Sequence, residues 1–89
     1  MFIYYEETFV PEIGVMMDFA ADIYVEFDSE ANDHTVEVER LHLWDNEREY
    51  APFHPENEVQ KALAAALTRY VEKDEKAKDY AWDQWSAAA

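Results

Sequence analysis

Residues 15–28 alternate strictly between two kinds of side chain. The odd positions are all apolar: Val15, Met17, Phe19, Ala21, Ile23, Val25 and Phe27. Four of the seven even positions are carboxylates: Asp18, Asp22, Glu26 and Asp28. Because successive side chains of a strand point to opposite faces, the pattern predicts one long strand with a buried face and an acidic face in water.

Two further strands are predicted beside this one. Residues 2–10 are rich in aromatic and β-branched side chains, and a turn follows in which Gly14 is free to take a positive φ. A polar hairpin loop leads to a return strand over residues 35–44. There the apolar parity changes between Val38 and Leu41, so we expect either a β-bulge near Glu39 and Arg40, which we favour, or burial on both sides.

Residues 56–86 are predicted to be helical. An apolar stripe recurs at three- to four-residue spacing: Val59, Ala62, Leu63, Ala66, Leu67, Tyr70 and Val71. Asn57 followed by Gln60 resembles a capping box, and Pro55 is an equally good start signal. Asp74 interrupts the stripe, which resumes at Ala77, so one long helix and two helices both stay open.

Together these elements predict a single α+β domain over residues 1–89. A three-stranded antiparallel sheet would carry the C-terminal helix, or two helices, on one face, with Leu63 and Leu67 over the buried face of the long strand. The predicted parts are a β-meander at 1–45, a loop at 46–55, a helical region at 56–86 and a frayed tail at 87–89. Tyr50 and Phe53 of the loop are expected to pack under the helix.

Composition excludes several functional classes. The chain is 49% hydrophobic and 16% aromatic, which excludes a disordered chain despite its charge. It has no cysteine, and no apolar run approaches the roughly 20 residues of a membrane helix, so we expect a cytoplasmic protein with no membrane partner. It also lacks a phosphate loop, an HExxH motif and a nucleophile elbow, so we expect no enzyme and assign no catalytic residue.

Residues 28–39 match a calcium-binding loop only weakly. The register places Asp28, Glu30, Asn32, His34, Val36 and Glu39 at the ligand positions. However, Asp33 occupies the position that requires glycine, so a polar hairpin loop is favoured. The three histidines lack zinc spacing, and we expect neither a metal nor a cofactor.

The net charge of −14 is distributed unevenly. Sixteen of the 21 acids and only two bases precede residue 59, whereas residues 59–89 hold five of each. On the predicted sheet, one acidic face would collect six carboxylates: Asp18, Asp22, Glu26, Asp28, Glu37 and Glu39. Acids at every second residue of two adjacent strands give about one charge per 3.4 Å, close to the phosphate spacing of one DNA strand.

Three aromatic side chains near the C-terminus, Tyr80, Trp82 and Trp85, admit two interpretations. They either close the end of a small core or form an exposed patch that binds a partner or a second copy of the chain.

The chain resembles, in size, charge and pattern, the small acidic inhibitors encoded by phages, which include anti-restriction DNA mimics and several anti-CRISPR proteins. Residues 15–75 carry this resemblance: the acidic run DFAADIYVEFDSEAND, then VEVE, then a helix, with no cysteine. It implies phage or mobile-element origin, and inhibition of a host protein by occupation of its basic nucleic-acid-binding surface. No catalytic or ligand residue is carried over, because such proteins share no site motif.

Two principal hypotheses follow. The first is an inhibitor whose acidic face binds such a host protein, with no direct binding to nucleic acid because the charge repels phosphates. The alternative is a structural or adaptor domain that dimerises or docks through its aromatic C-terminal helix, so the chain is expected to be a monomer or a homodimer. A metal-dependent or ligand-binding module is a third possibility.

Overall fold

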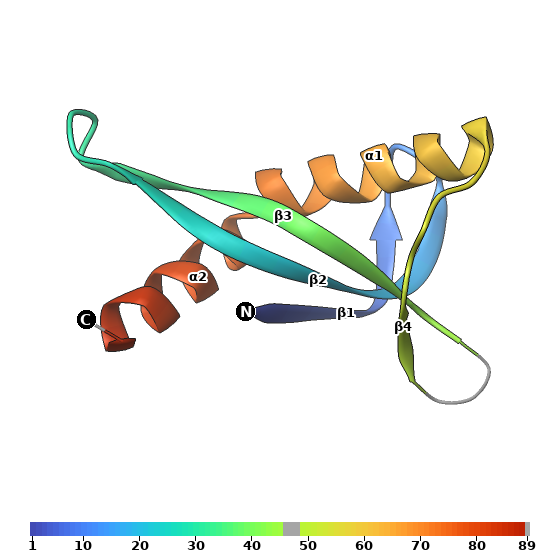
Figure 1. Ribbon diagram of the computed structural model, residues 1–89, viewed down its shortest axis with the longest axis horizontal. Coiled ribbons are helices and arrows are strands. Elements are labelled where there is room, and N and C mark those ends of the chain that lie inside the picture. Colours follow the sequence, from blue (N-terminus) through green and yellow to red (C-terminus); the bar gives the residue numbers. More distant parts are fainter. Residues whose placement is uncertain (46–48, 89) are drawn as a thin grey trace.

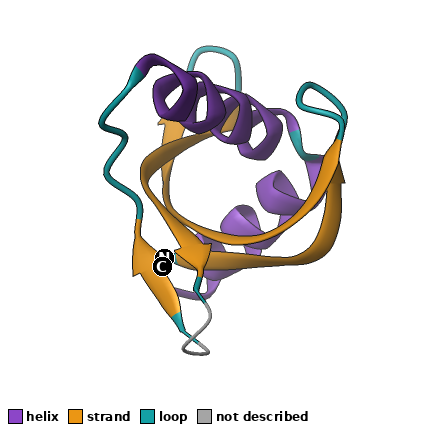
Figure 2. Ribbon diagram, turned by 90° about the vertical axis from the view of Figure 1, so that its right-hand side faces the viewer, coloured by secondary structure: helices purple, strands orange, loops and turns teal. Residues whose placement is uncertain are grey.

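A computed structural model describes residues 1–45 and 49–88 as one curved sheet with two helices. The elements are β1 (Phe2–Val10), β2 (Val15–Asp28), β3 (Asp33–Trp44), β4 (Tyr50–Pro52), α1 (Glu58–Lys73) and α2 (Glu75–Ala88). The sheet is antiparallel, with the strand order β1-β2-β3-β4 (Figure 1). Both helices lie on its concave side (Figure 2). The predicted α+β fold is confirmed, and of the two open alternatives the structure has two helices.

The short strand β4 lies in the segment predicted to be a loop. It pairs with the end of β3, where Trp44 is opposite Tyr50. The loop prediction is therefore wrong for residues 50–52, and residues 46–48 lie outside the described part of the chain. Phe53 packs on the core as expected. Tyr50 does not lie under the helix, because its ring contacts those of Tyr4 and Trp44, at centroid distances of 5.2 and 5.0 Å.

The core lies between the helices and the apolar face of β2. The odd positions Phe19, Ala21 and Ile23 are at most 1% exposed, as the alternation predicts. Leu67 of α1 is fully buried in the same cluster, against which Leu63 packs. Ala77 and Ala81 of α2 are also fully buried.

Two β-bulges shape the sheet. In β3, Val38 pairs with Ile23 and Arg40 with Asp22, which leaves Glu39 as the extra residue and confirms the predicted bulge. The second bulge was not predicted: in β1, Glu6 and Glu7 together oppose one residue of β2, and Glu7 takes φ 45°. In Figure 1, β1 turns sharply along its length.

Helix α1 begins at Glu58, with Asn57 as its N-cap. The Asn57 side chain accepts a hydrogen bond from the Gln60 N–H at 2.8 Å, so Asn57 rather than Pro55 sets the start. The helix ends because Asp74 is extended, with φ −78° and ψ 116°. Helix α2 then runs to Ala88, so residues 87 and 88 of the predicted tail are helical, and Ala89 lies outside the described residues.

The N-cap gives a first prediction. Asn57→Ala removes the acceptor of the Gln60 N–H and is expected to lower the free energy of unfolding by about 1 kcal/mol. Asn57→Ser is the control, because a serine hydroxyl accepts the same hydrogen bond. Urea denaturation followed by circular dichroism measures both, and equal stability of the two variants would contradict the capping role.

Candidate functional site

The six carboxylates predicted to form one acidic face differ in their surroundings. Asp22 is only 8% exposed and forms ion pairs with the Met1 amino group, at 3.1 Å, and with Arg40, at 3.3 Å. Burial alone would raise the pKa of Asp22, yet the hydrogen bonds and charges of these two cations lower it. The prediction that Asp22 is a free anion in water is therefore wrong, because the register places Arg40 directly opposite it.

Asp22 lies on the outer face of the sheet, which is the face turned away from the helices. Aromatic side chains cover this face around Asp22. Phe2 contacts the His42 ring at a centroid distance of 5.0 Å, and Tyr4 lies beside Tyr50. Ala20, on this face, is fully buried. The outer face is thus covered by rings around Asp22, with acids on either side: Glu6, Glu7 and Asp18 toward one end, and Glu26 and Glu37 toward the hairpin.

Two other predicted carboxylates accept backbone hydrogen bonds. Asp18 accepts from the Glu7 N–H at 2.6 Å and so holds the bulge of β1. Asp28 accepts from the N–H groups of Glu30 and Ala31, at 3.0 and 3.3 Å, and so forms the turn of the β2–β3 hairpin. Both carboxylates therefore have a structural role in the free protein.

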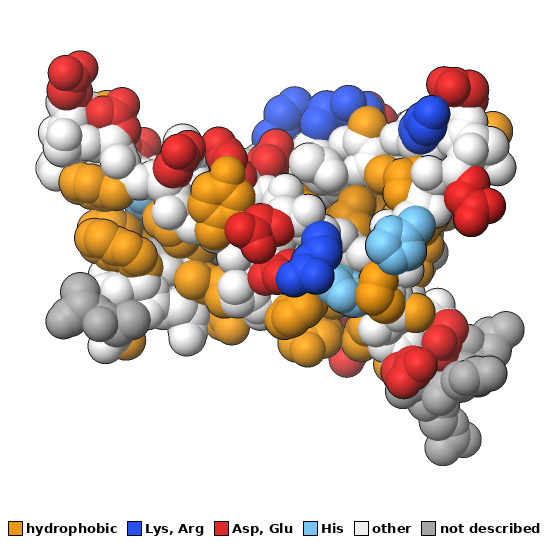
Figure 3. Space-filling view, in the orientation of Figure 1, with side chains coloured by type: hydrophobic (Ala, Val, Ile, Leu, Met, Phe, Trp, Pro, Cys, Tyr) orange, Lys and Arg blue, Asp and Glu red, His pale blue; other side chains and the backbone are white. Residues whose placement is uncertain are grey.

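The remaining three, Glu26, Glu37 and Glu39, form what we call the glutamate cluster. They surround Tyr24, which is paired with Glu37 in the sheet and donates a hydrogen bond from its hydroxyl to the Glu37 carboxylate. Within residues 1–45 and 49–88, no cation lies at ion-pair distance from any of the three. In Figure 3, acidic side chains follow the hairpin from its tip toward the middle of the molecule.

Hydrogen bonds to Glu37 and the neighbouring negative charges both shift pKa values in the glutamate cluster. The hydrogen bond to Glu37, together with burial and the three negative charges, raises the pKa of Tyr24 to about 12. Glu37 also raises the pKa of Glu26. The larger cause is a hydrogen bond that the protonated Glu26 carboxyl donates to Glu37, and the next is the negative charge of Glu37. A raised carboxyl pKa means that this interaction stabilises the fold most at acidic pH, and that the contribution is lost as pH rises through the folded pKa.

The three aromatic side chains near the C-terminus are all exposed: Tyr80 is 37%, Trp82 37% and Trp85 41%. The residue that sequence reasoning missed is Phe27, which is 43% exposed and whose ring lies 5.8 Å from that of Trp85. We call Phe27, Trp82 and Trp85 the aromatic patch. Among the described residues, Tyr80 makes no ring contact with them. Phe27 is the last odd position of β2. Its place at the end of the strand was the sequence signal for its exposure.

Several residues of the weak calcium register are used in other contacts of the fold. Asp28 is engaged in the turn, β3 already begins at Asp33, and the His34 Nε2–H donates to the Lys78 carbonyl at 2.9 Å. Across the described residues, no group of three or more histidine or carboxylate side chains is placed to hold a metal ion.

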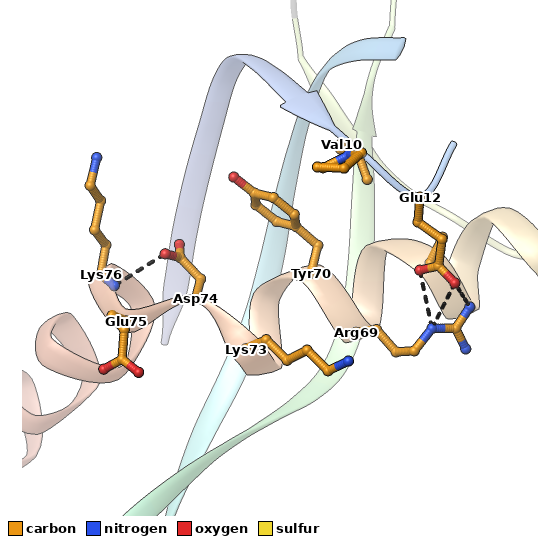
Figure 4. A pocket seen from close by; sticks show the side chains of 10 residues that line it. Val10, Glu12, Arg69, Tyr70, Lys73, Asp74, Glu75 and Lys76 are labelled. Atoms are coloured by element: carbon orange, nitrogen blue, oxygen red, sulfur yellow. Dashed lines mark hydrogen bonds and ion pairs between the residues drawn. The ribbon is translucent and has the colours of Figure 1, made fainter. Parts of the chain in front are cut away.

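A cavity of about 750 Å³ lies between the β1–β2 turn and the junction of the two helices (Figure 4). Val10 and Tyr70 give it an apolar wall, and the Arg69 guanidinium is held by the Glu12 carboxylate. The charged side chains that line it are balanced, with three bases (Arg69, Lys73, Lys76) and three acids (Glu12, Asp74, Glu75). This cavity, which sequence reasoning missed, therefore presents no dominant charge to a ligand.

No protein-family model, curated protein or solved structure matches this chain. Neither helix of the described chain has the length and apolar character needed to cross a bilayer. Among the described residues, two surfaces open to a partner lie next to each other: the glutamate cluster, on the outer face of the hairpin, and the aromatic patch, between the hairpin and α2.

Proposed function

We propose that this chain is a small protein-binding inhibitor, whose glutamate cluster docks onto the basic nucleic-acid-binding surface of a host protein. One observation carries the proposal: the fold compensates several of its acids, yet no cation of residues 1–45 and 49–88 pairs with Glu26, Glu37 or Glu39. Asp22, Asp33 and Glu12 each have a basic partner within 3.3 Å.

The energetic reason is that clustered like charges raise the free energy of the unbound protein. A surface that carries lysine and arginine for phosphates relieves that repulsion, steers association and releases its own counterions. The chain itself is expected not to bind nucleic acid, because a net charge of −14 repels phosphates. A gel shift with duplex DNA at physiological salt checks this expectation.

The test is competition with DNA. A bacterial lysate is bound to a DNA column and the column is eluted with the purified chain. We expect the chain to release one or a few DNA-binding proteins at about 50 mM salt and much less at about 200 mM, since the interaction is screened. The triple variant Glu26→Gln, Glu37→Gln, Glu39→Gln should lose this release while its thermal stability is unchanged or increased, because repulsion is removed.

The matched control is the triple variant Glu49→Gln, Glu56→Gln, Glu75→Gln. It changes the net charge equally, but on exposed acids outside the cluster. Release by the control at the level of the unmodified chain supports the proposal. Equal release by both triple variants, or no release by the unmodified chain at low salt, removes it.

The alternative, an adaptor that self-associates through its aromatic C-terminal helix, is favoured by the exposure of Trp82 and Trp85. Analytical ultracentrifugation separates the two functions. A dimer that resists high salt and is lost in Trp85→Leu supports the adaptor, whereas a monomer at all salt concentrations supports the inhibitor.

A further inference from the structure

We infer that the aromatic patch is a docking surface for arginine side chains of the same basic partner, an assignment that rests on the proposed function. The glutamate cluster would supply charge, and the patch would select arginine over lysine. Four features of the molecule support this: an ordered geometry, exposed aromatic rings, acidic surroundings and, among the described residues, no unpaired lysine or arginine beside the rings.

The patch is ordered before any partner arrives. Phe27 of β2 stacks on Trp85 of α2 with an interplanar angle of 11°. Trp82 contacts Trp85 at a centroid distance of 5.3 Å and His34 at 4.9 Å. Since the His34 ring is itself held by the Lys78 carbonyl, the rings lose little freedom on binding.

The rings are also open to solvent. The fully buried side of α2 is formed by Ala77 and Ala81, whereas Trp82, Trp85 and Phe27 remain 37%, 41% and 43% exposed. Hydrophobic side chains are visible between the hairpin and α2 at the left end of Figure 3. The aromatic rings therefore keep more than a third of their surface open to a partner.

The surroundings of the patch are acidic. Phe27 shares a hollow of about 470 Å³ at the hairpin end with Glu26, Asp28 and Glu30. On α2, Asp79 lies one turn before Trp82, and both Asp79 and Asp83 are exposed. Residues 24–37 contain no lysine or arginine, and the nearby Lys78 is paired with Asp33 at 3.2 Å.

These features favour a cationic occupant with a flat face. The guanidinium of arginine stacks on aromatic rings and donates hydrogen bonds to carboxylates from its edge, whereas the ammonium of lysine is compact and strongly hydrated. A second copy of this chain would bring the same acids against these acids, and an apolar partner would leave them unpaired. Arginine side chains of a basic protein can both stack on the aromatic rings and pair with the surrounding carboxylates.

The experiment uses tryptophan fluorescence in a Trp44→Phe background, in which the only remaining tryptophans are Trp82 and Trp85. The probes are two peptides of equal length and charge, one with alternating glycine and arginine and the other with alternating glycine and lysine. We expect the arginine peptide to change the emission and to bind about two- to fivefold more tightly than the lysine peptide.

Three variants in this background assign the effect. Phe27→Leu should abolish the arginine preference, while Phe9→Leu, at an exposed phenylalanine outside the patch, should retain it. The glutamate-cluster triple variant should weaken both peptides and leave their ratio unchanged. Thermal melts establish that each variant is folded, and the comparison of the two peptides on the unmodified patch requires no patch variant.

Each remaining outcome is decisive. Equal affinities for the two peptides overturn the inference. Tryptophan emission that changes with protein concentration but not with peptide also overturns it, because the occupant of the patch is then a second copy of the chain. If the arginine preference holds but the chain releases nothing from the DNA column, the proposed function fails, and only the binding of arginine by the patch stands. If release occurs with equal peptide affinities, only the patch assignment fails.

Discussion

Leu67→Ala is expected to lower the free energy of unfolding by about 2–5 kcal/mol, the range for truncation of a fully buried leucine. Leu67 is 0% exposed and belongs to the cluster that contains Phe19 and Ile23. Its removal leaves a cavity between α1 and the sheet, and the neighbouring side chains fill that cavity only partly. Since small domains are marginally stable, this is a large share of the total.

Two substitutions on the same helix are the controls. Leu63 is half-buried, so Leu63→Ala should cost less than Leu67→Ala. Val59 is 79% exposed, so Val59→Ala should have almost no effect. Urea denaturation at neutral pH ranks the three variants, and a Leu67→Ala midpoint equal to that of Val59→Ala would show that α1 packs elsewhere.

The second large effect is expected at the junction of the two helices. Tyr5 is 8% exposed, and its hydroxyl donates to the Asp74 carboxylate at 2.8 Å. Asp74→Ala leaves that hydroxyl without its acceptor, and we expect a loss of about 1–3 kcal/mol. Tyr5→Phe removes the donor and leaves the ring, so it should cost about 0.5–1.5 kcal/mol. A double-mutant cycle between the two positions, measured by urea denaturation, isolates their interaction.

The same contact predicts a dependence on alkaline pH. Burial, and then the neighbouring Asp74 carboxylate, raise the pKa of Tyr5 well above its usual value of 10.0. The native state therefore holds a proton that the unfolded state releases, so stability is complete below about pH 10 and falls as pH rises above it. Tyr5→Phe should flatten this decline. Urea midpoints between about pH 8 and 11 measure it, and an equal slope in both proteins would contradict the assignment.

The sequence predicted the architecture well where local pattern and packing agree. The alternation over residues 15–28 identified β2 and its buried face at Phe19, Ala21 and Ile23, but it was wrong for Val15 and Phe27, which are exposed at the strand ends. The change of parity between Val38 and Leu41 located the β3 bulge. The break at Asp74 also coincides with the interruption of the helix stripe. In each case the signal lies within one element.

What sequence reasoning missed depends on register between distant segments. Asp22 is neutralised by the Met1 amino group, 21 residues away along the chain, and by Arg40 on the next strand. No spacing within β2 indicates either partner. Likewise, Phe27 joins Trp85 only because α2 turns back under the hairpin after Asp74. The six-residue acidic face thus became a three-residue cluster beside an aromatic patch.

The bulge of β1 has a consequence for how other chains could add to this sheet. An edge strand invites pairing with a further strand, but a bulge with two adjacent glutamates, Glu6 and Glu7, breaks the ladder there. The opposite edge strand, β4, ends at Pro52, which has no N–H to donate. Where β3 extends past β4, backbone groups on its edge are also hydrogen-bonded. The Val38 N–H donates to the Glu72 carboxylate at 3.3 Å, and the Leu41 carbonyl accepts from the Phe53 N–H at 2.8 Å. Backbone-mediated fibre growth and strand exchange are thereby opposed at these points, and recognition is left to side chains.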